Sequence, residues 1–119
     1  MWKRRLHSFL YAGRGIGQVL RREPNMRIHA LATVVMTGLG LVVGISRWEW
    51  AAQWLAIGLV WSTEIINTVW ENYLDELHPE RSPTVGRLKD MAAGAVLVAA
   101  LTAVAVGITI YGPRIWSLL

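Results

Sequence analysis

The stretch Glu64-Ile-Ile-Asn67-Thr-Val-Trp-Glu71-Asn-Tyr-Leu-Asp75 begins inside an apolar segment and carries polar side chains out of it. Because an α-helix turns by about 100° per residue, the three acids and Asn67 fall on one helix face. Ionisable side chains are costly at membrane depth, so such a face is a functional-site hypothesis by default. The alternative is a polar seam that only joins helices, but seams usually use Ser, Thr or Asn rather than repeated acids.

The rest of the chain is apolar enough to place this face in a membrane protein. The 119 residues are 54% hydrophobic, and the mean hydropathy is +0.37. Residues 30–46 and 91–113 carry no charge, and residues 50–70 carry only Glu64. A helix needs about 20 such residues to cross the hydrocarbon core of a bilayer. We therefore expect a single all-α integral membrane domain, residues 1–119, with three transmembrane helices at about 26–46, 50–72 and 88–112.

The amino-terminal segment differs from these spans. Residues 5–22 have apolar side chains at helical spacing and basic side chains on the other faces. This pattern beside a membrane span predicts an amphipathic helix that lies in the headgroup plane. Pro24 disfavours a helical conformation at Glu23 and suits the first turn of the next helix.

The connections between the spans are expected to be short. Ser46–Trp50 reads as an external turn in which Arg47 and Glu49 are solvated and have no role. Residues 78–83 contain two prolines and read as a loop before the third span. No signal peptide that would be removed is expected, because the basic start leads into an amphipathic segment rather than a short apolar one.

The charge distribution predicts the topology. The formal net charge is +4, and ten of the twelve Lys and Arg residues lie before the first span or between the second and third. The positive-inside rule places these segments and the amino terminus in the cytoplasm and the carboxyl terminus outside. Since the basic residues lie beside membrane spans, anionic lipid explains them better than nucleic acid. The chain has no cysteine, so disulfides and thiolate metal sites are excluded.

Acidic residues gather at the predicted cytoplasmic boundary. Glu23 precedes the first span, Glu71 follows the apolar part of the second, and Asp90 stands beside Lys89 at the start of the third. Carboxylates are the ligands that Mg²⁺ prefers, with water and phosphate oxygens completing its shell, so Glu23 and Glu71 could share one ion. Phosphoryl transfer needs such a metal, cations on the phosphates and a base near the acceptor hydroxyl. Glu64, which lies deeper, has the depth of a lipid hydroxyl and could be that base.

Each of these residues also has an ordinary structural explanation. Glu71 and Asp75 could form a solvated helix face, Lys89 and Asp90 an ion pair at a helix start, and Glu23 a helix-end acid. Two other functions remain open from the residues alone. A small oligomeric transporter would use Glu64 as a proton site, and a non-catalytic membrane assembly subunit would use the acids as structural ion pairs. A transporter gives no reason for Glu23, Lys89 and Asp90, which favours phosphoryl transfer.

The pattern resembles a known family. Glu64-x-x-Asn67-Thr68-x-x-Glu71-x-x-x-Asp75, followed by Lys89-Asp90-x-x-x-Gly94-Ala95-Val96-Leu97, is similar to the signature of the bacterial diacylglycerol kinase family, which includes undecaprenol kinases. Upstream, Ser8-Phe9-x-Tyr11-Ala12 and Glu23-x-Asn25-x-Arg27-Ile28-His29 look like its surface helix and first span, and Gly44–Trp50 looks like its external turn. The resemblance covers nearly the whole chain in the same order.

The resemblance implies a lipid kinase of the bacterial plasma membrane that forms a homotrimer, with active sites between subunits at the cytoplasmic interface. ATP is the phosphoryl donor, Mg²⁺ is required, and the acceptor is the hydroxyl of diacylglycerol or undecaprenol. The form Arg27-Ile28-His29 leans toward members that act on the polyprenol.

The resemblance also implies roles for individual residues. Glu64 matches the catalytic base, and Asn67 the amide that supports it. Glu23 and Glu71 match the metal-binding acids. Nucleotide-site positions are matched by these two acids and by Arg4, Tyr11, Gly86, Lys89 and Asp90.

Three departures from the family pattern stand out. The loop before the third span lacks the histidine that members often carry, and the nearest one, His78, lies earlier. Pro24 and Trp70 are also unusual at their positions.

Overall fold

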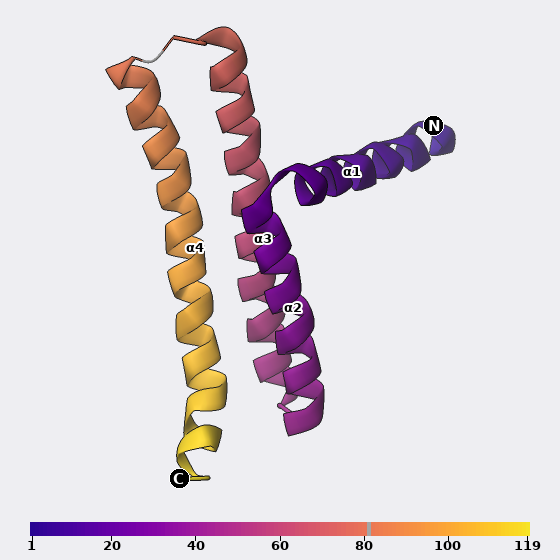
Figure 1. The fold of residues 1–119 in the computed structure, drawn as a ribbon. Helices are drawn as coiled ribbons and strands as arrows, with labels where there is room; N and C mark the ends of the chain where they lie inside the picture. The colour runs from indigo at the N-terminus through magenta and orange to yellow at the C-terminus, as the bar shows by residue number, and fades with distance from the viewer. Residues whose placement is uncertain (81) are drawn as a thin grey trace.

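The computed structural model describes residues 1–80 and 82–119 and contains no strand within them, which confirms the all-α class. Its four helices are α1 (Trp2–Arg22), α2 (Pro24–Val43), α3 (Arg47–Leu77) and α4 (Pro83–Trp116). Figure 1 shows α2, α3 and α4 running side by side, while α1 projects sideways from the bundle. Helix α3 is the centre of the fold, because it packs along α4 on one side and against α2 on the other. The expected loop at 78–83 includes Arg81, which lies outside the described residues.

Two of these helices, α2 and α4, are long and apolar enough to cross a membrane. A core helix of a soluble protein can pass the same test, but it would be buried by its neighbours. Only 11% of the most apolar window of either helix is buried within this chain. Helix α3 is 31 residues long but more polar, because it carries the acidic face. These helices therefore present apolar surface that lipid or another chain must cover.

The junction between α1 and α2 is fixed by side-chain contacts to the backbone. Glu23 has an extended backbone and Pro24 is the first residue of α2, as the sequence predicts. Arg27 donates hydrogen bonds from Nη1 to the carbonyl oxygens of Arg21 at 2.7 Å and Leu20 at 3.3 Å. These carbonyls end α1 and have no partner within that helix, so Arg27 satisfies them and holds the bend. Helix α1 begins at Trp2, earlier than the expected residue 5.

The connection between α2 and α3 differs from the expected turn at Ser46–Trp50. Helix α2 ends earlier, at Val43, and its C-cap Gly44 has a φ of 72°, in the left-handed region that favours glycine. Ser46 then caps α3, and its side chain and that of Glu49 form a reciprocal capping box with each other's backbone N–H. Arg47 and Glu49 therefore belong to the helix, and the expectation of a longer turn is wrong because this capping signal starts α3 sooner.

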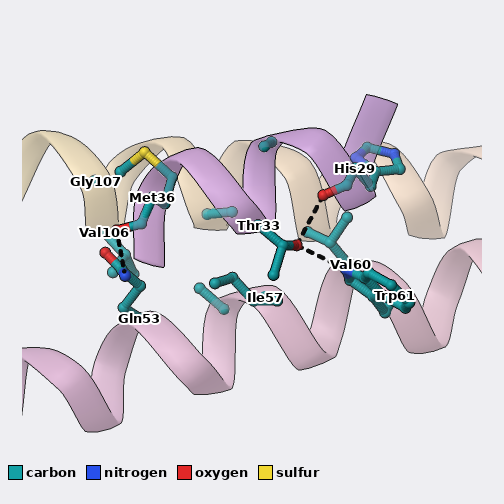
Figure 2. A pocket seen from close by; sticks show the side chains of 12 residues that line it. His29, Thr33, Met36, Gln53, Ile57, Val60, Trp61, Val106 and Gly107 are labelled. Atoms are coloured by element: carbon teal, nitrogen blue, oxygen red, sulfur yellow. Dashed lines mark hydrogen bonds between the residues drawn. The ribbon is translucent and has the colours of Figure 1, made fainter. Parts of the chain in front are cut away.

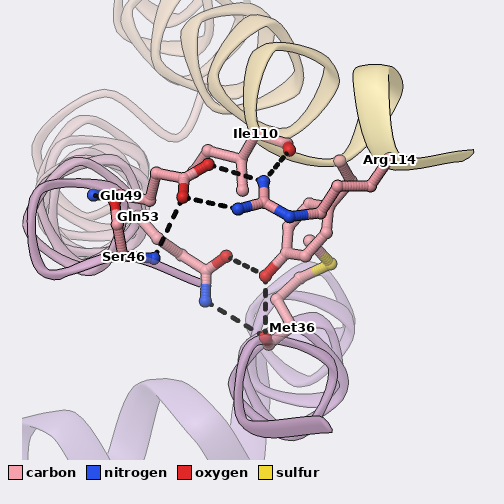
Figure 3. Close-up of polar contacts among 7 residues, drawn as sticks. Met36, Ser46, Glu49, Gln53, Ile110 and Arg114 are labelled. Carbon is pink, nitrogen blue, oxygen red and sulfur yellow. Dashed lines mark hydrogen bonds and ion pairs between the residues drawn. The ribbon is translucent and has the colours of Figure 1, made fainter. Parts of the chain in front are cut away.

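The prediction that Glu49 has no role is also wrong. Arg114 of α4 donates to both of its carboxylate oxygens, at 2.7 and 2.8 Å. Figure 3 shows this pair beside a second link, in which Gln53 donates to the Met36 carbonyl at 3.1 Å and accepts from the Tyr111 hydroxyl at 2.7 Å. Because these groups come from α2, α3 and α4, one end of the three-helix bundle is joined by polar contacts.

A small apolar cluster lies beside these contacts. Ile45, Ile110 and Tyr111 are buried there, with Met36, Trp50 and Val106 packed against them. A Cβ added at Gly40 would come within 2.9 Å of the Trp50 ring, so glycine allows α2 and α3 to approach closely here.

The Glu49–Arg114 pair should make stability depend on pH. The hydrogen bonds from Arg114 and from the Ser46 backbone lower the pKa of Glu49 from 4.5 to about 2. A lowered pKa contributes stability that is fully present above pH 4.5 and is lost as the pH falls through 2. We therefore expect Glu49→Gln to lower the thermal unfolding midpoint in detergent at pH 7, and the difference from the unsubstituted protein to shrink between pH 4.5 and 2.

Glu76→Gln is the matched control for this experiment, because Glu76 is an exposed glutamate on the same helix. Its unfolding midpoint at pH 7 should equal that of the unsubstituted protein. A Glu49→Gln difference that persisted unchanged at pH 2 would show that the pair is not the source.

Candidate active site

The polar face of α3 runs from a buried end to an exposed end. Glu64 is 3% exposed and Asn67 is 8% exposed, whereas Glu71 is half-buried and Asp75 is exposed. Thr68 satisfies its own hydroxyl within the helix by donating to the Glu64 carbonyl at 3.0 Å. The sequence prediction that these polar groups share one face is thus confirmed by one continuous helix.

The carboxylate of Glu64 faces a histidine from the neighbouring helix. His29 Nε2 of α2 lies 3.4 Å from Glu64 Oε2, and the side chains are 23% and 4% exposed. In the sequence, His29 belongs to the stretch that resembles the family's first span, and no partner for it is predicted. The available signal was a lone titratable residue just inside an apolar span, in a chain whose second span contains a lone acid.

Asn67 links the buried and exposed parts of the face. Its Nδ2 donates to Glu71 Oε1 at 3.2 Å, one helical turn away. A carboxylate only accepts hydrogen bonds, so this contact fixes the amide orientation and turns Oδ1 the other way. Oδ1 is buried and has no hydrogen-bond partner among the described residues. A buried acceptor without a partner is costly in a finished core and is consistent with a site that receives a donor from elsewhere.

The exposed end of the face contacts α4. Lys89 Nζ pairs with Asp75 Oδ1, and their side chains are 36% and 62% exposed. The alternative of a local Lys89–Asp90 ion pair is therefore replaced by a contact between helices. Asp90 and Gly86 are exposed on the same helix, close in sequence to Lys89.

Glu23 lies at the same height along the bundle as Glu71. The His29–Glu64 contact sets the register of the antiparallel α2 and α3. Glu23 comes six residues before His29 and Glu71 seven residues after Glu64, so the two acids lie about 9 Å and about 10.5 Å from that contact in the same direction. Among the described residues, no three His, Asp or Glu side chains are grouped closely enough to hold a metal ion.

The donor chemistry of this pair of acids fits magnesium. Mg²⁺ is commonly held by one or two carboxylates, with water and phosphate oxygens in its other positions, so a third protein ligand is not required. Glu71 has one oxygen engaged by Asn67 and a second that accepts no hydrogen bond from the described residues. Glu23 is half-buried at the bend between α1 and α2.

The two candidate residues on α1 are placed differently. Arg4 and Tyr11 are exposed, and the Arg14 guanidinium lies 5.7 Å from the centre of the Tyr11 ring. Helix α1 contacts α2 and α3 but not α4, and its amino terminus points away from the bundle in Figure 1. One chain therefore does not bring Arg4 and Tyr11 together with Lys89 and Asp90.

A cavity of about 120 Å³ lies between α2, α3 and α4. It extends from His29 toward the end of the bundle where α2 connects to α3. Figure 2 shows His29 at one end of it and Gly107 at the other. Its lining is mostly apolar, and the polar side chains in it are largely bonded to each other or to the backbone. In particular, Trp61 Nε1 donates to Thr33 Oγ1 at 2.9 Å, and Thr33 Oγ1 donates to the His29 carbonyl at 2.7 Å.

Comparison with known proteins gives consistent matches along the chain. Residues 10–111 match the family model described as prokaryotic diacylglycerol kinase. The undecaprenol kinase of Bacillus subtilis is 37% identical over 108 residues, which cover 91% of this chain and 88% of that protein. The diacylglycerol kinase of a Synechocystis species is 32% identical over 115 residues, which cover 96% of this chain and 66% of that protein.

Proposed function

Because the chain belongs to the prokaryotic diacylglycerol kinase family and is a lipid kinase acting on a membrane lipid, we propose that it uses ATP and Mg²⁺ to phosphorylate the hydroxyl of undecaprenol or diacylglycerol. The observation that carries the proposal is the face of α3, where a buried carboxylate, a buried amide and a half-buried carboxylate follow one another in register. Family membership removes the reason for the transporter and assembly-subunit alternatives.

In the proposed reaction, Glu64 is the proton acceptor. The lipid hydroxyl oxygen attacks the γ-phosphorus of ATP, and its proton moves to the Glu64 carboxylate. A bond forms between the lipid oxygen and the γ-phosphorus, and the bond from that phosphorus to the β–γ bridging oxygen breaks. The products are a lipid monophosphate and ADP. The burial of Glu64 supports this role, because water is largely excluded where the proton is transferred.

The remaining residues bind and orient the nucleotide. Glu23 and Glu71 would hold Mg²⁺, which would neutralise charge on the phosphates and fix their geometry. Asn67 restrains Glu71 through its hydrogen bond. Lys89 offers a positive charge to phosphate. Its ammonium group pairs with Asp75, which holds the lysine side chain of α4 against α3. Asp90, Gly86, Arg4 and Tyr11 are proposed nucleotide contacts.

We propose that the active enzyme is a homotrimer with sites between subunits. Two features of the single chain support an oligomer. Arg4 and Tyr11 lie on a helix that does not contact α4, so a neighbouring subunit is needed to unite them with Lys89 and Asp90. Apolar side chains are also exposed on every helix, including Leu31, Leu55 and Leu101 at 60–76%, and subunit contacts would cover part of this surface.

The proposed topology follows from charge. Three spans, α2, α3 and α4, and a surface-bound α1 place the amino terminus and the α3–α4 loop in the cytoplasm and the carboxyl terminus outside. The amphipathic α1 supports this arrangement, because Leu6, Phe9 and Leu10 are exposed on it. ATP would then reach the site from the side where it is made.

A direct assay tests the proposed reaction and its acceptor. Purified protein in mixed micelles with ATP and Mg²⁺ should form lipid phosphate, and omission of Mg²⁺ should abolish the product. We expect undecaprenol to react faster than diacylglycerol under matched conditions, because the relative with 37% identity is named for that lipid. The absence of product from both lipids, in protein that remains folded and oligomeric, would reject the proposal.

A further inference from the structure

We propose that His29 is a positioning residue for the reaction: its Nε2–H holds Oε2 of Glu64, which leaves Oε1 as the oxygen that takes the proton. The inference deepens the proposed function and rests on it. The carboxylate of Glu64 is nearly buried and needs a partner to keep a defined orientation. Among the described residues, His29 provides the side-chain contact to this carboxylate, at 3.4 Å from Oε2.

The distance between His29 Nε2 and Glu64 Oε2 fits an active site that has no substrate bound. At 3.4 Å it lies within ion-pair range but beyond the usual 2.7–3.2 Å of an N–H···O hydrogen bond. Hydrogen bonds in catalytic sites are often long before the substrate binds and shorten in the complex. His29 is also more exposed than Glu64, at 23% against 4%, so an approaching lipid headgroup would displace water from the histidine and strengthen the contact.

A chain of hydrogen bonds holds the backbone of His29 at this height. Trp61 of α3 donates to Thr33 of α2, and Thr33 donates to the His29 carbonyl oxygen (Figure 2). Trp61 comes three residues before Glu64, so the histidine and the carboxylate are set by bonds to the same turn of α3. The register of the two helices therefore fixes the imidazole opposite the carboxylate, and this chain is formed without any ligand.

Two polar substitutions separate the proposed role from a general effect on folding. Glutamine places an amide N–H near the position of Nε2, whereas asparagine has a shorter side chain that does not reach Glu64 Oε2. Both are neutral, polar and able to form hydrogen bonds, so their effects on folding should be similar. We expect His29→Gln to keep kcat within about 3-fold of the unsubstituted enzyme and His29→Asn to lower kcat by about 10-fold or more.

The experiment measures kcat and the KM for ATP and for undecaprenol, together with the oligomeric state, in the unsubstituted enzyme and both variants. A positioning role predicts that the Asn variant loses kcat while its KM for ATP and its assembly stay unchanged. Equal kcat values for the Gln and Asn variants would overturn the role of His29 while leaving the proposed reaction intact. An unsubstituted protein that forms no lipid phosphate would instead overturn the proposed reaction, and this inference with it.

Discussion

Glu64→Gln is expected to reduce the rate of lipid phosphorylation by about 10²–10⁴-fold, the range that a general base contributes. Glutamine has nearly the same volume as glutamate and can still contact His29, but its amide does not accept a proton from the lipid hydroxyl. Removing a buried charge should also leave the α3 packing intact, because Glu64 is 3% exposed and a neutral side chain costs less to bury. The loss should therefore appear in kcat, with little change in the KM for ATP.

Initial rates with undecaprenol and with diacylglycerol would measure this effect, with size-exclusion chromatography as the check on assembly. Glu76→Gln makes the same chemical change on the exposed part of α3 and should leave the rate unchanged. A Glu64→Gln enzyme with near-normal kcat would remove Glu64 from the role of base. Another acid of the same face would then be the candidate base.

Glu71→Gln should produce the second large loss, for a different reason. This substitution replaces a charged ligand by a neutral amide at a position where Mg²⁺ is proposed to bind, and hard cations prefer carboxylate oxygens. Asn67 would also lose its charged acceptor, since its Nδ2 donates to Glu71 Oε1. We expect the rate at a fixed Mg²⁺ concentration to fall by about 10²-fold, and the Mg²⁺ concentration for half-maximal rate to rise by about 10-fold or more.

A magnesium titration of the rate distinguishes this effect from damage to the fold. Glu76→Gln again serves as the control and should follow the unsubstituted titration curve. If the Glu71→Gln enzyme were slow but reached half of its own maximum at the normal Mg²⁺ concentration, Glu71 would not be a metal ligand. Glu64→Gln should give a slow enzyme with a normal half-maximal Mg²⁺ concentration. The two variants are therefore expected to differ in their magnesium dependence.

The polar face of α3 could be predicted from the sequence because all of its members belong to one helix. A periodicity of 3.6 residues fixes which side chains share a face, and the contacts between Asn67 and Glu71 span a single turn. The bend at Glu23–Pro24 was predictable for a similar reason, since the restriction that proline places on its neighbour is local.

Contacts between helices were not predictable in this way. His29 and Glu64 are 35 residues apart, and Glu49 and Arg114 are 65 residues apart. Their meeting depends on how far α2 and α4 slide along α3, which hydrophobic periodicity does not specify. The small residues that favour close packing occur on several faces, so the sequence offered no unique register. The capping box is different, because Ser46 and Glu49 are only three residues apart and the sequence does carry this local signal for the start of α3.

The unbroken course of α3 has a consequence for how this enzyme can change over generations. The helix has 31 residues and is about 46 Å long, so it carries the proposed proton acceptor and the proposed cation-binding group on one continuous element. A single inserted or deleted residue between them would rotate one group relative to the other by about 100°. The proposed base and the proposed metal ligand would then no longer face the same phosphoryl group. Residues elsewhere on α3 can be replaced, but the number of residues between these two groups cannot change. The mutational record of such a chain should therefore contain many replacements and almost no changes of length between Glu64 and Asp75.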